Sequence, residues 1–162
     1  MKIVLTSDTH IPKKGRVLPG QLLKECKTAD LIIHAGDWSS MNVYHTLSKF
    51  AEVKAVYGNV DSEEIKEYFP EKEMFVINGF NIGVFHGHGE KKTTEKRVLE
   101  AFQEDSVDII VFGHSHIPLV RYVKKTLLIN PGSPMDKRML PYYSYGILHL
   151  TDIIKSEIIF FS

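Results

Sequence analysis

Side chains that bind divalent metal ions follow five apolar segments of this sequence. The segments end in "SDTH", "HAGD", "YGNVD", "FHGHG" and "FGHSH". Carboxylate and amide oxygens combined with several imidazoles, and without a thiolate, are the ligands that Mn, Fe, Zn and similar ions prefer. The motifs contain seven candidate metal ligands, which are Asp8, His10, Asp37, Asn59, His86, His114 and His116. The set is too large for one tetrahedral ion and fits two ions.

A pair of ions in one site predicts hydrolytic chemistry. Two metal ions ~3.5–4 Å apart acidify a bound water molecule and neutralise charge on a phosphoryl group during in-line attack. Such a pair needs a bridging ligand, and a carboxylate is suited to that role. Asp37 follows the central one of the first three predicted strands, so we predict that it is the bridge.

Each motif has an ordinary structural interpretation when it stands alone. An aspartate after a strand is commonly a turn or cap residue, and Asp61 is equally well interpreted as the N-cap of the next helix. The most specific motif is "GHSH", because strand alternation would put His114 and His116 on one side. The combination of motifs, each after an apolar segment, favours a metal site over these separate interpretations. Three other histidines are not expected to be ligands: His34 is predicted to be a near-core residue, His45 a surface or packing residue, and His149 a structural one.

The elements that must position these residues follow a βαβα order and then a run of strands. Apolar runs and helical spacing predict three strands over 2–7, 29–37 and 53–59, and three helices over 19–26, 39–50 and 62–68. A polar loop is predicted over 8–15. A hairpin turning at Asn78-Gly79, a helix over 93–105, a strand over 107–116 and four short strands complete the chain. This order predicts two packed sheets with outer helices, with the ligands at the carboxyl ends of the strands.

Composition limits the classes of function. The 162 residues suit one domain over 1–162, and 20 basic against 20 acidic residues give a net charge of +0. A balanced chain provides no electrostatic signal for nucleic-acid or membrane-surface binding. No apolar run approaches the ~20 residues that span a bilayer. The single cysteine, Cys26, excludes an internal disulfide and agrees with a cytoplasmic location.

The motifs "SDTH", "HAGD", "YGNVD", "FHGHG", "FGHSH" and "INPGS" together resemble the calcineurin-like metallophosphoesterases. The resemblance covers nearly the whole chain and is strongest to the small single-domain phosphodiesterase branch of bacteria and archaea. It implies an α/β fold, a four-layer αββα sandwich of two mixed sheets flanked by helices, with a dinuclear centre. One metal ion would be held by Asp8, His10, Asp37 and His116, and the other by Asp37, Asn59, His86 and His114. Manganese is the expected ion, with Ni, Fe, Zn and Co as alternatives.

One position departs from the pattern of the superfamily. Many members have a histidine directly after the asparagine, where it contacts the phosphate and protonates the leaving group. The corresponding residue here is Val60, which can do neither. We predict that His88 contacts the phosphate instead, so that Asn59 and His88 are the catalytic residues. Weak proton donation favours substrates with good leaving groups.

The resemblance implies an enzyme that hydrolyses a small phosphodiester with a hydroxide bound to the dinuclear centre. A phosphomonoesterase or a nucleotide pyrophosphatase is the alternative among enzymes. A metal-binding scaffold for protein interactions is the alternative from another class, because a retromer subunit has a similar fold. All seven ligand positions carry competent side chains, which favours the enzyme. The strand over 155–161 is predicted to be an edge that either forms a homodimer surface or is covered.

Overall fold

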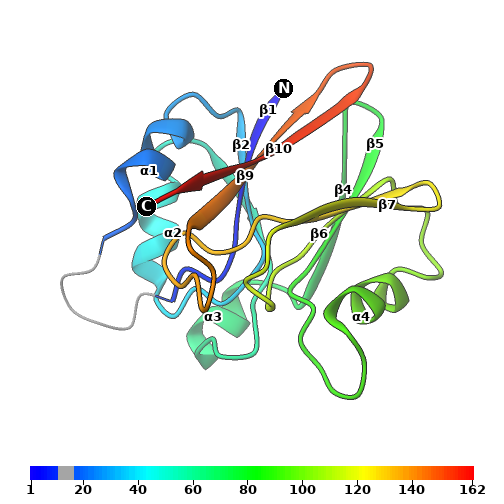
Figure 1. Cartoon of the computed structure of the whole chain (residues 1–162), viewed down its shortest axis with the longest axis horizontal. Helices are drawn as coiled ribbons and strands as arrows, with labels where there is room; N and C mark the ends of the chain where they lie inside the picture. Colours follow the sequence, from blue (N-terminus) through cyan, green and yellow to red (C-terminus); the bar gives the residue numbers. More distant parts are fainter. Residues whose placement is uncertain (11–16) are drawn as a thin grey trace.

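A computed structural model describes residues 1–10 and 17–162 of the chain (Figure 1). Most of the loop predicted over 8–15 lies outside the described residues. The described part forms two five-stranded sheets, and every predicted helix and strand is present in it, most of them a few residues shorter than expected. The two sheets together bring the ends of the predicted strands to one region of the molecule.

The first sheet joins the beginning of the chain to its end. Its strand order is β10-β9-β1-β2-β3, formed by Ile154–Phe161, Tyr143–Leu150, Lys2–Thr6, Leu31–His34 and Glu52–Ala55. β1 pairs in parallel with β2 and antiparallel with β9. The continuous apolar runs of β1 and β2 are explained by burial on both faces of the sheet. β10 is an edge strand as predicted, and its pairing in a homodimer stays a prediction.

The second sheet contains the hairpin and the strand that precedes "GHSH". Its strand order is β4-β5-β6-β8-β7, formed by Lys72–Ile77, Phe80–Phe85, Ile109–Val111, Thr126–Asn130 and Leu119–Val123. β5, β6 and β8 run in parallel, and the two outer strands run antiparallel to their neighbours. The hairpin turns at Asn78 and Gly79, whose φ angles of 49° and 83° are the positive values that a type I′ turn requires.

The sheets pack face to face and helices cover their outer faces. Aliphatic side chains from both sheets, including Leu5, Ile33, Val84 and Ile129, form the central core. Helices α1 (Gly20–Cys26), α2 (Met41–Leu47) and α3 (Glu63–Tyr68) cover the first sheet, and α4 (Thr94–Ala101) covers the second (Figure 1). This arrangement confirms the predicted αββα sandwich. None of the helices in the described ranges has the length and apolar character that crossing a bilayer requires.

Candidate metal centre

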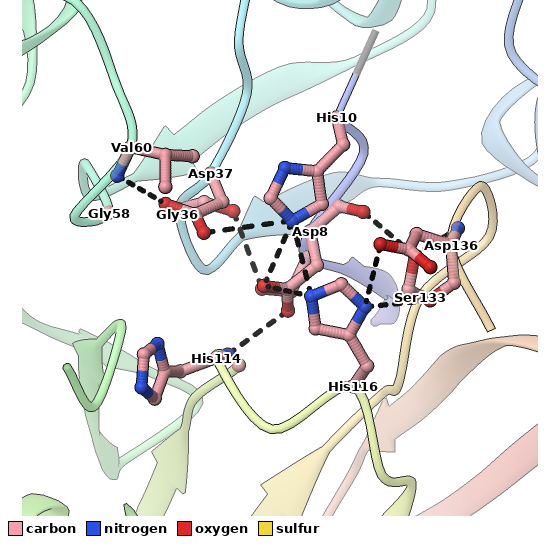
Figure 2. A network of polar contacts seen from close by, with 12 residues as sticks. Asp8, His10, Gly36, Asp37, Gly58, Val60, His114, His116, Ser133 and Asp136 are labelled. Carbon is pink, nitrogen blue, oxygen red and sulfur yellow. Dashed lines mark hydrogen bonds and ion pairs between the residues drawn. The ribbon is translucent and has the colours of Figure 1, made fainter. Parts of the chain in front are cut away.

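The carboxyl ends of strands from both sheets meet at one end of the sandwich. In the first sheet, the backbone N–H of Asp8 donates to the Gly36 carbonyl at 2.9 Å, which joins the loops after β1 and β2. In the second sheet, the Gly113 N–H donates to the His86 carbonyl at 3.1 Å. The two sheets are connected where the backbone N–H of His114 donates to Asp8 Oδ2 at 3.1 Å. Residues far apart in the chain are therefore held within contact distance, as Figure 2 shows.

Five of the seven predicted ligands form two groups whose side-chain atoms converge. The first group is Asp8, His10 and His116, and the second is Asp8, Asp37 and His86, with one ligand atom of each residue within 4.8 Å of the others in its group. The Nε2 atom of His116 lies 3.3 Å from Asp8 Oδ1, and that of His86 lies 3.2 Å from Asp37 Oδ2. Asp37 Oδ2 is also 3.7 Å from His10 Nε2. Both carboxylates thus lie between the two groups, and the bridging role of Asp37 stays a prediction.

Two buried polar atoms of these groups indicate that the donor set suits a cation. Asp8 Oδ1 and His86 Nε2 are fully buried and have no hydrogen-bond partner within the described part of the chain. Burying a charged oxygen without a partner is costly, so such atoms normally pair with another group or with a metal ion. A divalent ion between the carboxylates and the imidazoles would satisfy both atoms. The residues present therefore fit a metal site.

Backbone carbonyls set the tautomers of two imidazoles in the form that metal binding needs. The Nδ1 atom of His86 lies 2.7 Å from the Ala35 carbonyl, and that of His116 lies 2.6 Å from the Asp136 carbonyl. A carbonyl oxygen only accepts, so Nδ1 carries the hydrogen in both rings. The lone pair of each neutral ring is then on Nε2, the atom that faces the carboxylates. This arrangement is the usual outer support of a metal-bound histidine.

The carboxylates and imidazoles shift each other's pKa values. Burial raises the pKa of Asp37, but the close approach of the His86 ring and its charge outweigh burial and lower that pKa to about 2. Burial lowers the pKa of His86, yet the close approach of the Asp37 carboxylate and the charge of Asp8 leave it above its ordinary value. The pKa of His116 is raised in the same way by Asp8. Without an ion, these histidines therefore hold protons more tightly than exposed histidines do.

Protons are expected to compete with metal ions for this site. Divalent ions bind neutral imidazole, and the raised pKa values keep His86 and His116 protonated to a higher pH. The affinity for Mn²⁺ should therefore fall as the pH is lowered from about 8 to about 6, by roughly tenfold per pH unit for each proton released. Calorimetric titration in buffers of different protonation enthalpy measures both the affinity and the proton release. Equal affinities across this range would contradict the expectation.

Asn59 and His114 lie beside the second group and contact each other. His114 Nδ1 is 3.0 Å from Asn59 Oδ1, and the centre of the His114 ring is 5.2 Å from that of His86. The backbone N–H of Val60 donates to Asp37 Oδ1 at 3.1 Å, which fixes the loop after β3 against that carboxylate. Neither Asn59 nor His114 belongs to the two converging groups, so their roles as ligands stay predictions.

The strand predicted over 107–116 is wrong beyond its first half. β6 ends at Val111, and both histidines of "GHSH" follow in a loop with left-handed backbone, at φ angles of 67° for His114 and 58° for His116. The two rings consequently face different neighbours, and strand alternation does not bring them together. The loop passes so close to β1 that a Cβ atom on Gly113 would lie 1.9 Å from Ser7 Oγ. Close contact with the first sheet ends the strand, and only glycine fits there.

Left-handed backbone recurs at the ligands of the first sheet. The φ angles are 55° for Asp8, 35° for His10 and 58° for Asp37. This region costs non-glycine residues energy and is typical of functional sites, where the surroundings hold the strained conformation. The conformation of the loops, and not the pleat of the strands, therefore sets the direction of these side chains.

Asp61 supports the loop of Asp37, and its interpretation as a helix cap is wrong. The N-cap of α3 is Ser62. The buried carboxylate of Asp61 accepts four backbone N–H groups from two loops. These donors are Asp37 at 2.9 Å, Trp38 at 2.7 Å, Ser39 at 2.9 Å and Gly58 at 2.7 Å. The sequence contains the acidic residue next to a candidate ligand, but the distant donors are visible only in the fold.

His88 lies next to the second group and pairs with Glu71, outside that group. The centre of its ring is 5.7 Å from that of His86, and its Nε2 atom is 3.4 Å from Glu71 Oε1. Burial, with the charge of His86, lowers the pKa of His88 below its ordinary value, so the ring is neutral at neutral pH. Its Nδ1 atom is buried with no hydrogen-bond partner within the described ranges. The predicted contact of His88 with phosphate stays a prediction.

The turn "NPGS" packs beside the site and supports its backbone. Asn130 Nδ2 donates to the Gly113 carbonyl at 2.9 Å, and Ser133 Oγ donates to the Asp8 carbonyl at 2.7 Å. His34 is a buried structural histidine, as predicted. It hydrogen-bonds with Thr9 Oγ1 at 3.1 Å and stacks on the indole ring of Trp38. These residues support the backbone around the candidate ligands without contributing to either group.

Comparisons with known proteins agree with this site. The sequence model of one protein family, the calcineurin-like phosphoesterase superfamily domain, matches residues 1–153 of this chain. A probable metallophosphoesterase of Methanocaldococcus jannaschii is 34% identical over 160 residues, which cover 98% of this chain and 81% of that protein. A phosphodiesterase of the same organism is 30% identical over 145 residues, which cover 82% and 83%.

A solved structure shows the same fold. Zinc-bound Vps29 of Entamoeba histolytica superposes with a TM-score of 0.77 over 100% of both chains, at 24% identity. At this identity the likeness concerns the fold alone. The family match over residues 1–153, together with the relatives above, shows that this chain belongs to the calcineurin-like phosphoesterase superfamily.

Proposed function

We propose that the protein is a phosphodiesterase with a dinuclear metal centre. The observation that carries the proposal is the convergence of two ligand groups on Asp8, with Asp37 between them. The relative named as a phosphodiesterase supports the preference for diesters. We propose a small phosphodiester as the substrate and the cytoplasm as the location, which agrees with a single, buried cysteine.

The residues of the site have separable tasks in this function. Two divalent ions would acidify water and neutralise charge on phosphoryl oxygens when bound. Asp8 and Asp37 would provide the negative charge that holds the ions, and His86 and His116, when neutral, would present the lone pairs of their Nε2 atoms to them. Manganese suits this mixture of carboxylate and imidazole, with Ni, Fe, Zn and Co as alternatives.

The absence of a proton donor at Val60 restricts the substrate. Val60 follows Asn59 and is 53% exposed beside the site, where its side chain offers no proton. The leaving oxygen must then depart as an anion or take its proton from water. Since general acid catalysis is weak in this arrangement, substrates with acidic leaving groups should react fastest.

Turnover of an activated diester tests the function. We expect protein stripped of metal by a chelator to be inactive, and protein given Mn²⁺ to hydrolyse bis(p-nitrophenyl) phosphate faster than p-nitrophenyl phosphate. Release of p-nitrophenolate measures both rates. Inactivity with each of the five ions would contradict the proposal, and faster hydrolysis of the monoester would indicate a phosphomonoesterase.

A further inference from the structure

The loop over 131–142 is anchored to the candidate metal centre at two points. Ser133 Oγ donates to the Asp8 carbonyl at 2.7 Å and accepts the backbone N–H of Asp136 at 2.8 Å. The carbonyl of Asp136 in turn accepts Nδ1–H of His116. Figure 2 shows Ser133 and Asp136 beside Asp8 and His116. The segment that follows Asp136 is therefore held at the edge of the site.

Arg138 leaves this loop with its guanidinium next to a candidate ligand. Its Nη2 atom lies 3.3 Å from His116 Nε2, the nitrogen that faces Asp8. Its Nε atom lies 3.4 Å from Asp136 Oδ2, and the side chain is 60% exposed. The left-handed backbone of Arg138, with φ 51°, and a hydrogen bond from its N–H to Asp136 Oδ1 at 3.2 Å hold it there. One side of the guanidinium thus faces the centre and the other faces solvent.

The contact with His116 and a metal ion on His116 exclude each other. The Nε2 atom of neutral His116 has one lone pair, with two possible donors beside it: His10 Nε2 at 3.1 Å and Arg138 Nη2 at 3.3 Å. An ion bound at Nε2 would take this lone pair from both. When an ion is bound, the guanidinium loses this acceptor but remains tethered by Asp136. An arginine with free N–H groups at the edge of a phosphoryl site binds anionic oxygens strongly, because its planar fork matches their geometry.

We propose that Arg138 binds a non-bridging phosphoryl oxygen of the substrate, an inference that rests on the proposed phosphoesterase function. Among the described residues, the other arginine close to the site, Arg97, is already engaged within the protein. Arg97 Nε donates to the Gly87 carbonyl at 2.8 Å, Nη2 donates to Thr94 Oγ1 at 3.2 Å, and Nη1 donates to the Lys92 carbonyl. Arg97 therefore supports the loop of His86, whereas Arg138 is placed to contact the substrate.

Binding of inorganic phosphate to the manganese-loaded protein tests this role without turnover. We expect Arg138→Gln to weaken phosphate binding roughly ten- to hundredfold, the effect of losing a hydrogen bond between charged groups. The KM for bis(p-nitrophenyl) phosphate should rise as well, while the affinity for Mn²⁺ stays the same. Arg138→Lys should recover part of the phosphate affinity, because it retains the charge without the fork.

A matched variant controls for the loss of a surface charge. Arg121 on β7 is 56% exposed and pairs with Glu95 at 2.8 Å, so Arg121→Gln should bind phosphate like the unchanged protein. Wild-type phosphate affinity in Arg138→Gln would overturn this inference alone. Weaker binding of Mn²⁺ with normal phosphate affinity at full metal occupancy would do the same, since it indicates a merely supporting role. An unchanged protein that binds no metal ion would overturn the proposed function together with this inference.

Discussion

Asp37→Ala should abolish metal-dependent hydrolysis, lowering the rate by more than about 100-fold, since changes to the outer support of metal ligands already cost about 10–100-fold. The carboxylate lies between His10 and His86, at 3.7 Å and 3.2 Å from their Nε2 atoms. Without it, the ligand groups lose their shared negative charge, and His86 Nε2 remains buried against an apolar side chain. The loss should therefore appear in metal content as well as in turnover.

Metal analysis and rates on bis(p-nitrophenyl) phosphate measure this loss. Asp37→Asn keeps the shape of the side chain and removes its charge, so it should be nearly as inactive as Asp37→Ala. His86→Ala should show the same loss of metal content and activity. His45→Ala is the matched control, because His45 is exposed on α2 and outside both ligand groups. Full metal content and activity in Asp37→Ala would contradict the predicted role of this carboxylate.

Asp61→Asn is expected to have the largest effect on stability, although Asp61 is not a candidate ligand. Each oxygen of the carboxylate accepts two backbone N–H groups: Trp38 and Ser39 on Oδ1, and Asp37 and Gly58 on Oδ2. An amide has one oxygen, so its NH₂ group would face two N–H donors. The free energy of unfolding should fall by roughly 2–6 kcal/mol, because each unpaired buried donor costs about 1–3 kcal/mol.

Urea denaturation measures this loss, and metal titration of the folded fraction measures its effect on the site. The affinity for Mn²⁺ should fall roughly 10–100-fold, as for other outer supports of metal ligands. Asp108→Asn is the control, because Asp108 Oδ2 accepts the N–H of Asn81 at 2.8 Å and an amide oxygen can replace it. Equal stability losses in the two variants would contradict the special role of Asp61.

The fold was predictable because local patterns and burial agree in this chain. β1 and β2 are uninterrupted apolar runs, and both are buried on both faces. The period-2 burial of β4 and the turn at Asn78-Gly79 indicate a hairpin on their own. The boundaries were less predictable. Apolar residues continue past β6 into Phe112, which packs under α4 and not in a strand.

The identity of the candidate ligands was predictable, but the directions of their side chains and the contacts that hold them in place were not. Asp8, Asp37 and His86 follow buried strands, and parallel strands bring their ends to one edge. The left-handed turn at His114 and His116 depends on close contact between the two sheets, which no local pattern encodes.

The same limit applies to residues that act through long-range contacts. The position of Asp61 before α3 suggests a helix cap, whereas three of its four donors come from the loop over 37–39, which meets it only in the folded protein. Arg138 belongs to no motif and is separated from His116 by 22 residues. Its place at the site follows from the hydrogen bonds of Ser133 and Asp136, which hold the loop over 131–142 against Asp8 and His116.

The candidate ligands are divided between the two halves of the sandwich. Asp8 and Asp37 follow strands of the first sheet, and His86 and His116 follow strands of the second. Each of the ion pairs Asp8–His116 and Asp37–His86 joins a residue of one sheet to a residue of the other. A metal ion bound at either pair would connect the two sheets at this end of the sandwich. The free energy of unfolding of the whole sandwich should then be higher with the ion bound than without it, because an ion that binds only the folded state stabilises that state.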